Sequence, residues 1–274
     1  MSVEFDRQKL ELALQSGRNG ENSSFSLHIF DHLASTNQTL WNLLAQGAES
    51  WSVVIAQQQT AGRGQWGRQW ISHPGGLYLS VAIAPKLEAS ASYQLTLASA
   101  WGIANQLRCY GVDVGIKWPN DLVLNGRKLG GILTETKINH GYIHQAVIGV
   151  GINWTNPVPE TGINLEMWQA YYATKPISCL ETLTSVVLRG IESGMECLVK
   201  EGINILLSRY LELLTNVGDE VYINDLAGTV VGVTSQGELR VSLETYDTTD
   251  IKTTELYIEP GTISLGYRKS SVPL

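Results

Sequence analysis

The chain has few cysteines and no long apolar run, and each absence argues against a class of protein. Cys109, Cys179 and Cys197 have neither paired nor metal-like spacing, which indicates a reduced compartment rather than a disulfide framework. No apolar segment approaches the roughly 20 residues that a membrane helix needs. The N-terminal residues include acidic side chains and no apolar core segment, so they do not resemble a signal peptide. We therefore expect a cytoplasmic protein without membrane association.

The chain also lacks an excess of positive charge. Its formal net charge of -7 argues against non-specific nucleic-acid binding as a main role. Hydrophobic residues make up 43% and charged residues 16%, proportions typical of a globular protein rather than a disordered one. A length of 274 residues allows one substantial core and a small additional domain.

The hydrophobic pattern predicts an α+β protein in three parts. Residues 1–25 form a short N-terminal extension, 26–215 a main domain with a mixed β-sheet flanked by helices, and 216–270 a small antiparallel β-barrel. The predicted strands of the main domain span 26–30, 51–56, 76–85, 121–124, 129–136 and 143–150, and the predicted helices span 5–14, 35–47, 90–110, 178–199 and 203–214.

A glycine-arginine loop, TAGRGQWGRQW at residues 60–70, is the most informative segment. No Asp or Glu occurs from Trp51 to Leu87, although the whole chain is acidic. Glycine permits close backbone approach, and the guanidinium of Arg63 or Arg68 matches carboxylate and phosphate oxygens. The loop therefore predicts an anion-binding site, with an ordinary surface loop as the alternative.

The same loop contains the string Gly62-x-Gly64-x-x-Gly67, which is typical of dinucleotide-binding proteins. A Rossmann site needs a helix N-terminus directly after this string to hold the pyrophosphate. Here a His-Pro-Gly-Gly turn at residues 73–76 and then a β pattern follow instead. The sequence therefore argues against a dinucleotide site.

A second motif is Lys117-Trp118-Pro119-Asn120-Asp121, followed by a predicted hairpin that ends at Lys128. Asn125-Gly126 favours a type I′ turn between the two strands. The strands return side by side, so Lys117 and Lys128 are expected to point at one ligand, while Asp121 either holds a metal ion or orients a lysine. A solvated hairpin with scattered charges is the alternative interpretation.

A third motif ends the predicted strand at 143–150, where Gly149, Gly151 and Asn153 follow an apolar run. Glycines at this position let a flat ligand lie against the backbone, and the amide of Asn153 can hydrogen-bond a base edge. A β-bulge at the strand end explains the glycines equally well.

In this order, the three motifs resemble those of the biotin protein ligases, whose patterns are a GRGRxGRxW loop, a KWPND hairpin ending in a lysine and Gly-Ile-Leu, and a Gly-x-Gly-Ile-Asn strand end. The resemblance covers residues 26–155 strongly and implies a fold of the class II synthetase and biotin–lipoate ligase type. It also implies a two-step reaction: biotin and MgATP give biotinyl-5′-AMP, and a lysine of the biotin carboxyl carrier protein of acetyl-CoA carboxylase then attacks this intermediate.

The resemblance also implies roles for individual residues. It places Ser35, Thr36 and Gln59 at the biotin ureido ring, Arg63 at the biotin carboxylate and Arg68 at the ATP phosphates. The implied catalytic residues are Lys128, Arg63, Arg68, Lys117 and Asp121, with Asp121 also a candidate magnesium ligand. The implied biotin- and ATP-binding residues are Ser35, Thr36, Asn37, Gln59, Gly62, Arg63, Gly64, Trp70, Asn120, Lys128, Gly131 and Asn153.

Two classes of alternative remain open. A lipoate–protein ligase shares the fold and the adenylation chemistry, although the loop and hairpin patterns favour biotin. A non-catalytic adapter built on the C-terminal barrel would leave the charged loop unexplained. The short N-terminal extension resembles the monofunctional ligases, which lack a DNA-binding domain, so we expect no DNA partner and a monomer or homodimer. The C-terminal TISLGYR departs from the family's Gly-Glu-Val-Ser pattern.

Gln65 departs from the family pattern, because the family loop usually has a second arginine at this position. Glutamine keeps a hydrogen-bonding side chain but brings no charge. Our hypothesis is that the chain holds its intermediate less tightly or that its loop orders differently. In the first case Gln65→Arg is expected to slow the release of biotinyl-5′-AMP. The rate of biotinyl-5′-AMP release from the wild type and from Gln65→Arg, measured side by side, checks this. Equal rates would contradict the hypothesis.

Overall fold

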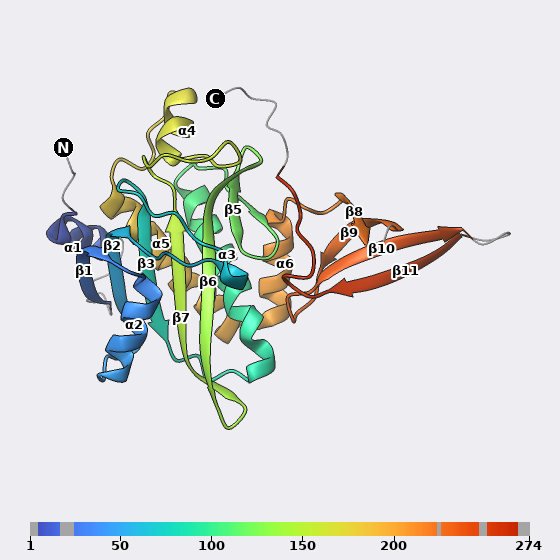
Figure 1. Ribbon diagram of the computed structural model, residues 1–274, viewed down its shortest axis with the longest axis horizontal. Coiled ribbons are helices and arrows are strands. Elements are labelled where there is room, and N and C mark those ends of the chain that lie inside the picture. Colours follow the sequence, from blue (N-terminus) through green and yellow to red (C-terminus); the bar gives the residue numbers. More distant parts are fainter. Residues whose placement is uncertain (1–4, 17–24, 224–225, 247–250, 268–274) are drawn as a thin grey trace.

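The computed structural model describes residues 5–16, 25–223, 226–246 and 251–267 and shows a mixed seven-stranded sheet in the main domain (Figure 1). The strand order is β1-β2-β3-β7-β6-β5-β4, with β1 and β2 parallel and every other neighbouring pair antiparallel. The strands are β1 (Ser26–Leu33), β2 (Ser52–Gln59), β3 (Leu77–Ile83), β4 (Gly115–Lys117), β5 (Asp121–Leu124), β6 (Arg127–Asn139) and β7 (Tyr142–Ile152).

The two faces of this sheet carry different helices. Alternate residues of the central strands point to opposite sides: Ile148 belongs to the large core, whereas its neighbour Val147 belongs to a smaller cluster with Leu40 and Leu44 of α2 (Thr36–Ala45). The large core lies under the remaining long helices. These are α1 (Arg7–Gln15), α3 (Ser92–Cys109), α5 (Leu180–Lys200) and α6 (Ile203–Leu213).

Close backbone contact joins α3 to α5 at the centre of this layer. A Cβ atom placed on Gly102 would lie 2.0 Å from the carbonyl oxygen of Gly190, and one on Gly194 would lie 2.1 Å from that of Ala98. The absence of side chains at these positions therefore sets how near the two helices come. No helix among the described residues combines the length and apolarity needed to cross a bilayer.

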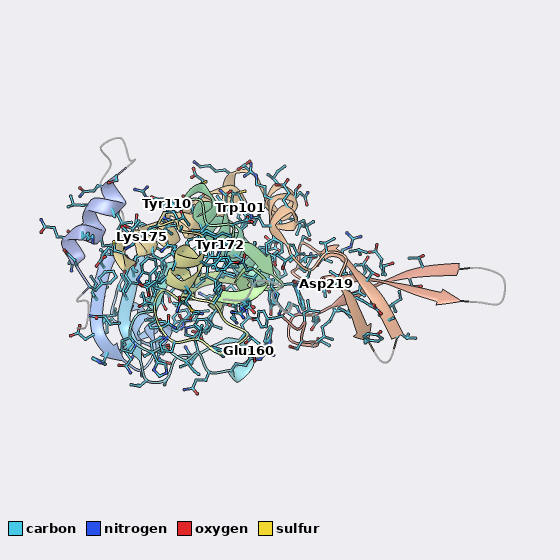
Figure 2. The ribbon with its side chains drawn as sticks, turned by 90° about the horizontal axis from the view of Figure 1, so that it is seen from above. Trp101, Tyr110, Glu160, Tyr172, Lys175 and Asp219 are labelled. Atoms are coloured by element: carbon cyan, nitrogen blue, oxygen red, sulfur yellow. The ribbon has the colours of Figure 1, made fainter. Side chains whose placement is uncertain are left out.

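The C-terminal strands form a separate four-stranded antiparallel sheet. Its order is β11 (Ile251–Ile258), β10 (Leu239–Tyr246), β9 (Leu226–Val233) and β8 (Glu220–Ile223). Figures 1 and 2 show this sheet extending away from the main domain, and Figure 2 shows Asp219 at the junction. In the described part of the chain, β8 and β11 form the two edges, so the predicted antiparallel unit is an open sheet rather than a closed barrel. The boundary at residue 216 stays a prediction.

The α+β fold class is confirmed, and most predicted elements are present. The hairpin turn has φ values of 51° at Asn125 and 75° at Gly126, as a type I′ turn requires. The glycine-arginine loop contains a 3-10 turn at Gln65–Gly67, and the next element along the chain is the strand β3. A strand rather than a helix at this place agrees with the exclusion of a dinucleotide site. Two short elements, β4 and α4 (Leu165–Tyr171), were not predicted from the sequence, because so few residues show little hydrophobic periodicity.

Candidate functional site

One cavity brings most of the predicted site residues together. Its walls come from the N-terminus of α2, the glycine-arginine loop, the β4–β6 region and residues 263–265 of the C-terminal segment. The predicted residues that line it are Ser35, Thr36, Asn37, Gln59, Arg63, Gly64, Arg68, Trp70, Lys117, Asn120, Asp121, Lys128 and Gly131. These residues come from segments that are far apart in the sequence, so the fold assembles a single site from the separate motifs.

Two predicted residues, Gly62 and Asn153, do not line this cavity. A Cβ atom on Gly62 would lie 2.4 Å from the Trp70 carbonyl oxygen, so glycine is needed where the two ends of the loop lie side by side. Asn153 is buried, and its Nδ2 donates to the carbonyl oxygens of Lys128 and Ile163, each at 3.3 Å. In the structure, Asn153 therefore supports the backbone that carries Lys128, and its predicted contact with a base edge remains a prediction.

A neutral polar end of the cavity lies at the start of α2. The Gln59 side-chain oxygen accepts hydrogen bonds from the Thr36 backbone N–H at 2.8 Å and the Thr36 hydroxyl at 3.2 Å. Ser80, which the sequence analysis missed, donates to Asn37 Oδ1 at 2.5 Å. Thr36, Asn37 and Ser80 are each under 5% exposed. Buried hydroxyl and amide groups of this kind can both donate to and accept from a small uncharged polar ligand.

The glycines of β7 are covered by the protein itself. A Cβ atom on Gly149 would lie 2.2 Å from Asn37 Oδ1, and one on Gly151 would lie 2.5 Å from the Trp70 ring. The pairing of β7 with β3 and β6 continues without a shift through both glycines, so no bulge explains them. The flat group lying against Gly151 is therefore the Trp70 indole, in the place where the sequence suggested a flat ligand.

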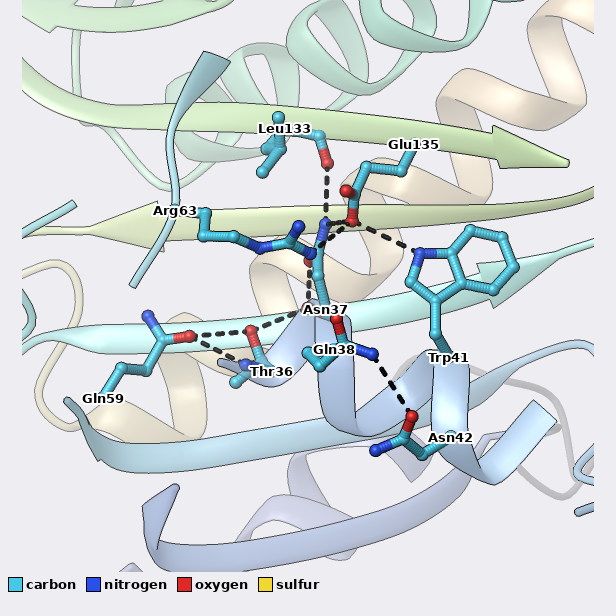
Figure 3. Close-up of polar contacts among 10 residues, drawn as sticks. Thr36, Asn37, Gln38, Trp41, Asn42, Gln59, Arg63, Leu133 and Glu135 are labelled. Atoms are coloured by element: carbon cyan, nitrogen blue, oxygen red, sulfur yellow. Dashed lines mark hydrogen bonds and ion pairs between the residues drawn. The ribbon is translucent and has the colours of Figure 1, made fainter. Parts of the chain in front are cut away.

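A carboxylate that the sequence analysis missed connects the loop with α2. Glu135 Oε2 accepts hydrogen bonds from Arg63 Nη2 at 2.9 Å and from Asn37 Nδ2 at 2.8 Å (Figure 3). Its Oε2 atom also accepts a longer bond of 3.3 Å from the Trp41 indole N–H. Period-two alternation along β6 places Glu135 on the same face as Gly131, and this alternation is the signal that could have found it.

A second carboxylate, Asp121, pairs with the lysines of the hairpin. Lys128 Nζ lies 2.6 Å from Asp121 Oδ1, and the Tyr267 hydroxyl donates to Asp121 Oδ2 at 2.5 Å. Lys117 Nζ lies 4.5 Å from the centre of the Tyr267 ring. The Tyr267 contact joins the C-terminal segment to the cavity, and no local pattern in the sequence pointed to it.

The charge of the cavity wall favours an anion. Arg63, Arg68, Lys117 and Lys128 line it, whereas Asp121 is the carboxylate among its lining residues. Burial lowers the pKa of Lys117, while Asp121 acts in the opposite direction. Burial and the adjacent Asp121 carboxylate raise the pKa of Tyr267, so its phenol stays protonated and donates. These cations can hold carboxylate and phosphate oxygens next to the polar end of the cavity.

Asp121 does not belong to a preformed metal site. In the parts of the chain that the structure describes, no group of three or more His, Cys, Asp or Glu side chains is arranged to hold a metal ion. Both Asp121 oxygens already interact, one with Lys128 and the other with Tyr267. Its role as a metal ligand therefore remains a prediction.

Comparison with known proteins finds the same family in sequence and in structure. Residues 29–153 match the model of the biotin/lipoate A/B protein ligase family. The chain is 32% identical over 226 residues to the bifunctional ligase/repressor BirA of Escherichia coli, covering 80% of this chain and 70% of that protein. It is 38% identical over 125 residues to BirA of Bacillus subtilis, covering 45% of this chain but only 38% of that protein.

The structural comparison shows the shared fold. The biotin protein ligase of Aquifex aeolicus, solved with biotin and ATP, superposes with a TM-score of 0.65 at 23% identity. The superposition covers 84% of this chain and 95% of that one.

Lys117→Met is expected to raise the stability of the folded protein by roughly 1 kcal/mol, because a buried charge is removed while Asp121 keeps Lys128 as its partner. The unfolded chain keeps this lysine protonated up to a pKa near 10.5, whereas the folded chain loses the proton at lower pH. The cost of burying the charge is thus complete below the lowered pKa and is relieved as the pH rises toward 10.5.

Thermal unfolding of both proteins across this pH range checks the expectation. The gain in melting temperature should be largest near neutral pH and should shrink in alkaline solution. A variant that melts below the wild type at neutral pH would show that Lys117 stabilises the fold.

Proposed function

The chain belongs to the biotin/lipoate A/B protein ligase family, and we propose that it is a biotin–protein ligase. The observation that carries the proposal is the continuity of one cavity from the polar residues Thr36 and Gln59 to the cations Lys117 and Lys128. A biotinyl adenylate needs both ends: a neutral ring that exchanges hydrogen bonds, and an acyl phosphate that carries negative charge.

In the first step, a carboxylate oxygen of biotin attacks the α-phosphorus of ATP and pyrophosphate leaves. Both reactants are anions, so their approach is opposed by charge repulsion that Arg63, Lys117 and Lys128 offset. Lys128 lies at the cavity wall between Asp121 and the Trp70 ring, at 2.6 Å from the carboxylate and 5.3 Å from the ring centre. This fixed position lets it stabilise charge developing on the phosphoryl group without rearranging.

In the second step, the amine of a carrier lysine attacks the acyl carbon of the mixed anhydride, AMP leaves and the nitrogen loses a proton. Residues 263–265 and the loop residues Gln65 and Trp66 also line the cavity. Covering the anhydride in this way limits its hydrolysis before the carrier arrives. Most of the acceleration then comes from positioning two reactants rather than from a covalent enzyme intermediate.

Magnesium enters this proposal as part of the substrate MgATP. Asp121 is the carboxylate of the described cavity wall, and magnesium in such sites usually binds one or two carboxylates together with substrate phosphates. Asp121 is therefore the side chain that would hold an ion arriving with ATP, and the ion would neutralise phosphate charge there.

The proposed partner is the biotin carboxyl carrier protein of acetyl-CoA carboxylase, with the chain acting in the cytoplasm as a monomer or homodimer and without DNA. The match to the biotin–[acetyl-CoA-carboxylase] ligase of Mycobacterium tuberculosis supports this choice, at 34% identity over 49% of this chain and 51% of that protein. Lipoate–protein ligase is the runner-up, because the matched family model includes both enzyme types.

We expect a biotin carboxyl carrier domain to gain the mass of one biotinyl group when it is incubated with the protein, biotin and MgATP. Lipoate in place of biotin should give no mass increase. Intact-mass spectrometry of the carrier measures both reactions. A lipoyl adduct without a biotinyl adduct would identify a lipoate–protein ligase, and no adduct with either acid would favour a non-catalytic role.

A pair of lysine variants shows whether the cavity carries this reaction. Lys128→Ala removes a charge at the cavity wall and should slow biotinyl-5′-AMP formation by about a hundredfold or more, the effect typical of losing one transition-state contact. Lys175 is exposed on the loop between α4 and α5, so Lys175→Ala is the matched control and should leave the rate unchanged. Wild-type rates in Lys128→Ala would contradict the assignment of the site.

A further inference from the structure

Glu135 lies outside the cavity wall, yet it contacts two residues that form it. Its Oε2 atom accepts from Arg63 Nη2 at 2.9 Å, from Asn37 Nδ2 at 2.8 Å and from the Trp41 indole N–H at 3.3 Å (Figure 3). Arg63 and Asn37 line the cavity, whereas Glu135 and Trp41 do not. One carboxylate oxygen on β6 therefore connects the glycine-arginine loop with the first turns of α2.

The contact with Asn37 fixes how that amide faces the cavity. Asn37 is 3% exposed, and its Oδ1 atom accepts from the Ser80 hydroxyl at 2.5 Å. Its Nδ2 group must then find an acceptor on the other side, which Glu135 supplies. A neutral glutamine at residue 135 would still offer an oxygen for this bond, so the asparagine does not by itself require a charge there.

The contact between Glu135 and Arg63 is an ion pair, so it depends on the negative charge at residue 135. The Arg63 side chain is 41% exposed, and an arginine side chain loses considerable rotamer freedom when it is held in one orientation. Among the described residues, Glu135 is its hydrogen-bond partner, and only Nη2 is used. The remaining N–H groups of the guanidinium fork stay available for an anion in the cavity.

We propose that Glu135 is a positioning residue, which holds the Arg63 guanidinium by Nη2 so that its other N–H groups meet the biotin carboxylate. This inference rests on the proposed function and adds a residue that does not touch substrate. The ion pair between Glu135 and Arg63 is partly exposed, and such a pair contributes little to stability, so we expect the loss of its charge to affect substrate binding rather than the fold.

Glu135→Gln tests this role, because it removes the charge while keeping size and an acceptor oxygen. The KM for biotin in adenylate formation should rise by about tenfold, as expected when a substrate-binding arginine loses its orientation. The KM for ATP should change by less than about twofold and the melting temperature should stay near that of the wild type, because packing is unchanged. Glu212, an exposed carboxylate on α6, provides the matched control Glu212→Gln, which should leave both KM values unchanged.

A double-mutant cycle shows whether Glu135 acts through Arg63. In an Arg63→Ala background, Glu135→Gln should alter the biotin KM by less than about twofold, because the group it positions is gone. The same tenfold rise in that background, or a single variant that binds biotin as well as or better than the wild type, would overturn the proposal. A wild-type protein that forms no biotinyl-5′-AMP would instead overturn the proposed function together with this inference.

Discussion

The site depends on the close packing of the Trp70 indole and the Asn37 amide against the backbone of β7. Glycines at 149 and 151 permit it, because a Cβ atom at either position would lie within 2.5 Å of these groups. The Trp70 contact turns the glycine-arginine loop back over the sheet, and the Asn37 contact seats α2 on the same face. Both the polar end and the charged end of the cavity follow from these two contacts.

Two carboxylates each pair with one cation of the cavity wall. Glu135 holds Arg63 through Nη2, and Asp121 holds Lys128 through Oδ1. Paired cations cost less to bury than isolated ones and keep a fixed orientation. The arrangement explains how an acidic chain keeps a cationic pocket: the pairing carboxylates lie on β5 and β6, while the segment from Trp51 to Leu87, which contains the glycine-arginine loop, has none.

Patterns among neighbouring residues predicted most of the helices and strands and revealed the three motifs. Asn125-Gly126 predicted its turn, and continuous apolar runs predicted the central strands, because both depend on neighbouring residues. The partners of the site residues were not predictable in this way. Glu135 meets Arg63 across 72 positions and Tyr267 meets Asp121 across 146, and only the folded chain brings them together. Asn153 does not line the cavity but hydrogen-bonds the Lys128 backbone, and its contact with a ligand stays a prediction.

We propose that one cavity holds the ring of biotin at α2 and the acyl phosphate at the cations of the loop and hairpin. A crystal structure with biotinyl-5′-AMP, or with a non-hydrolysable analogue, tests this placement. We expect ligand oxygens within about 3.2 Å of Arg63 and Lys128, and polar ring atoms at Thr36 or Gln59. A ligand bound elsewhere, or an acyl phosphate that touches neither cation, would contradict it.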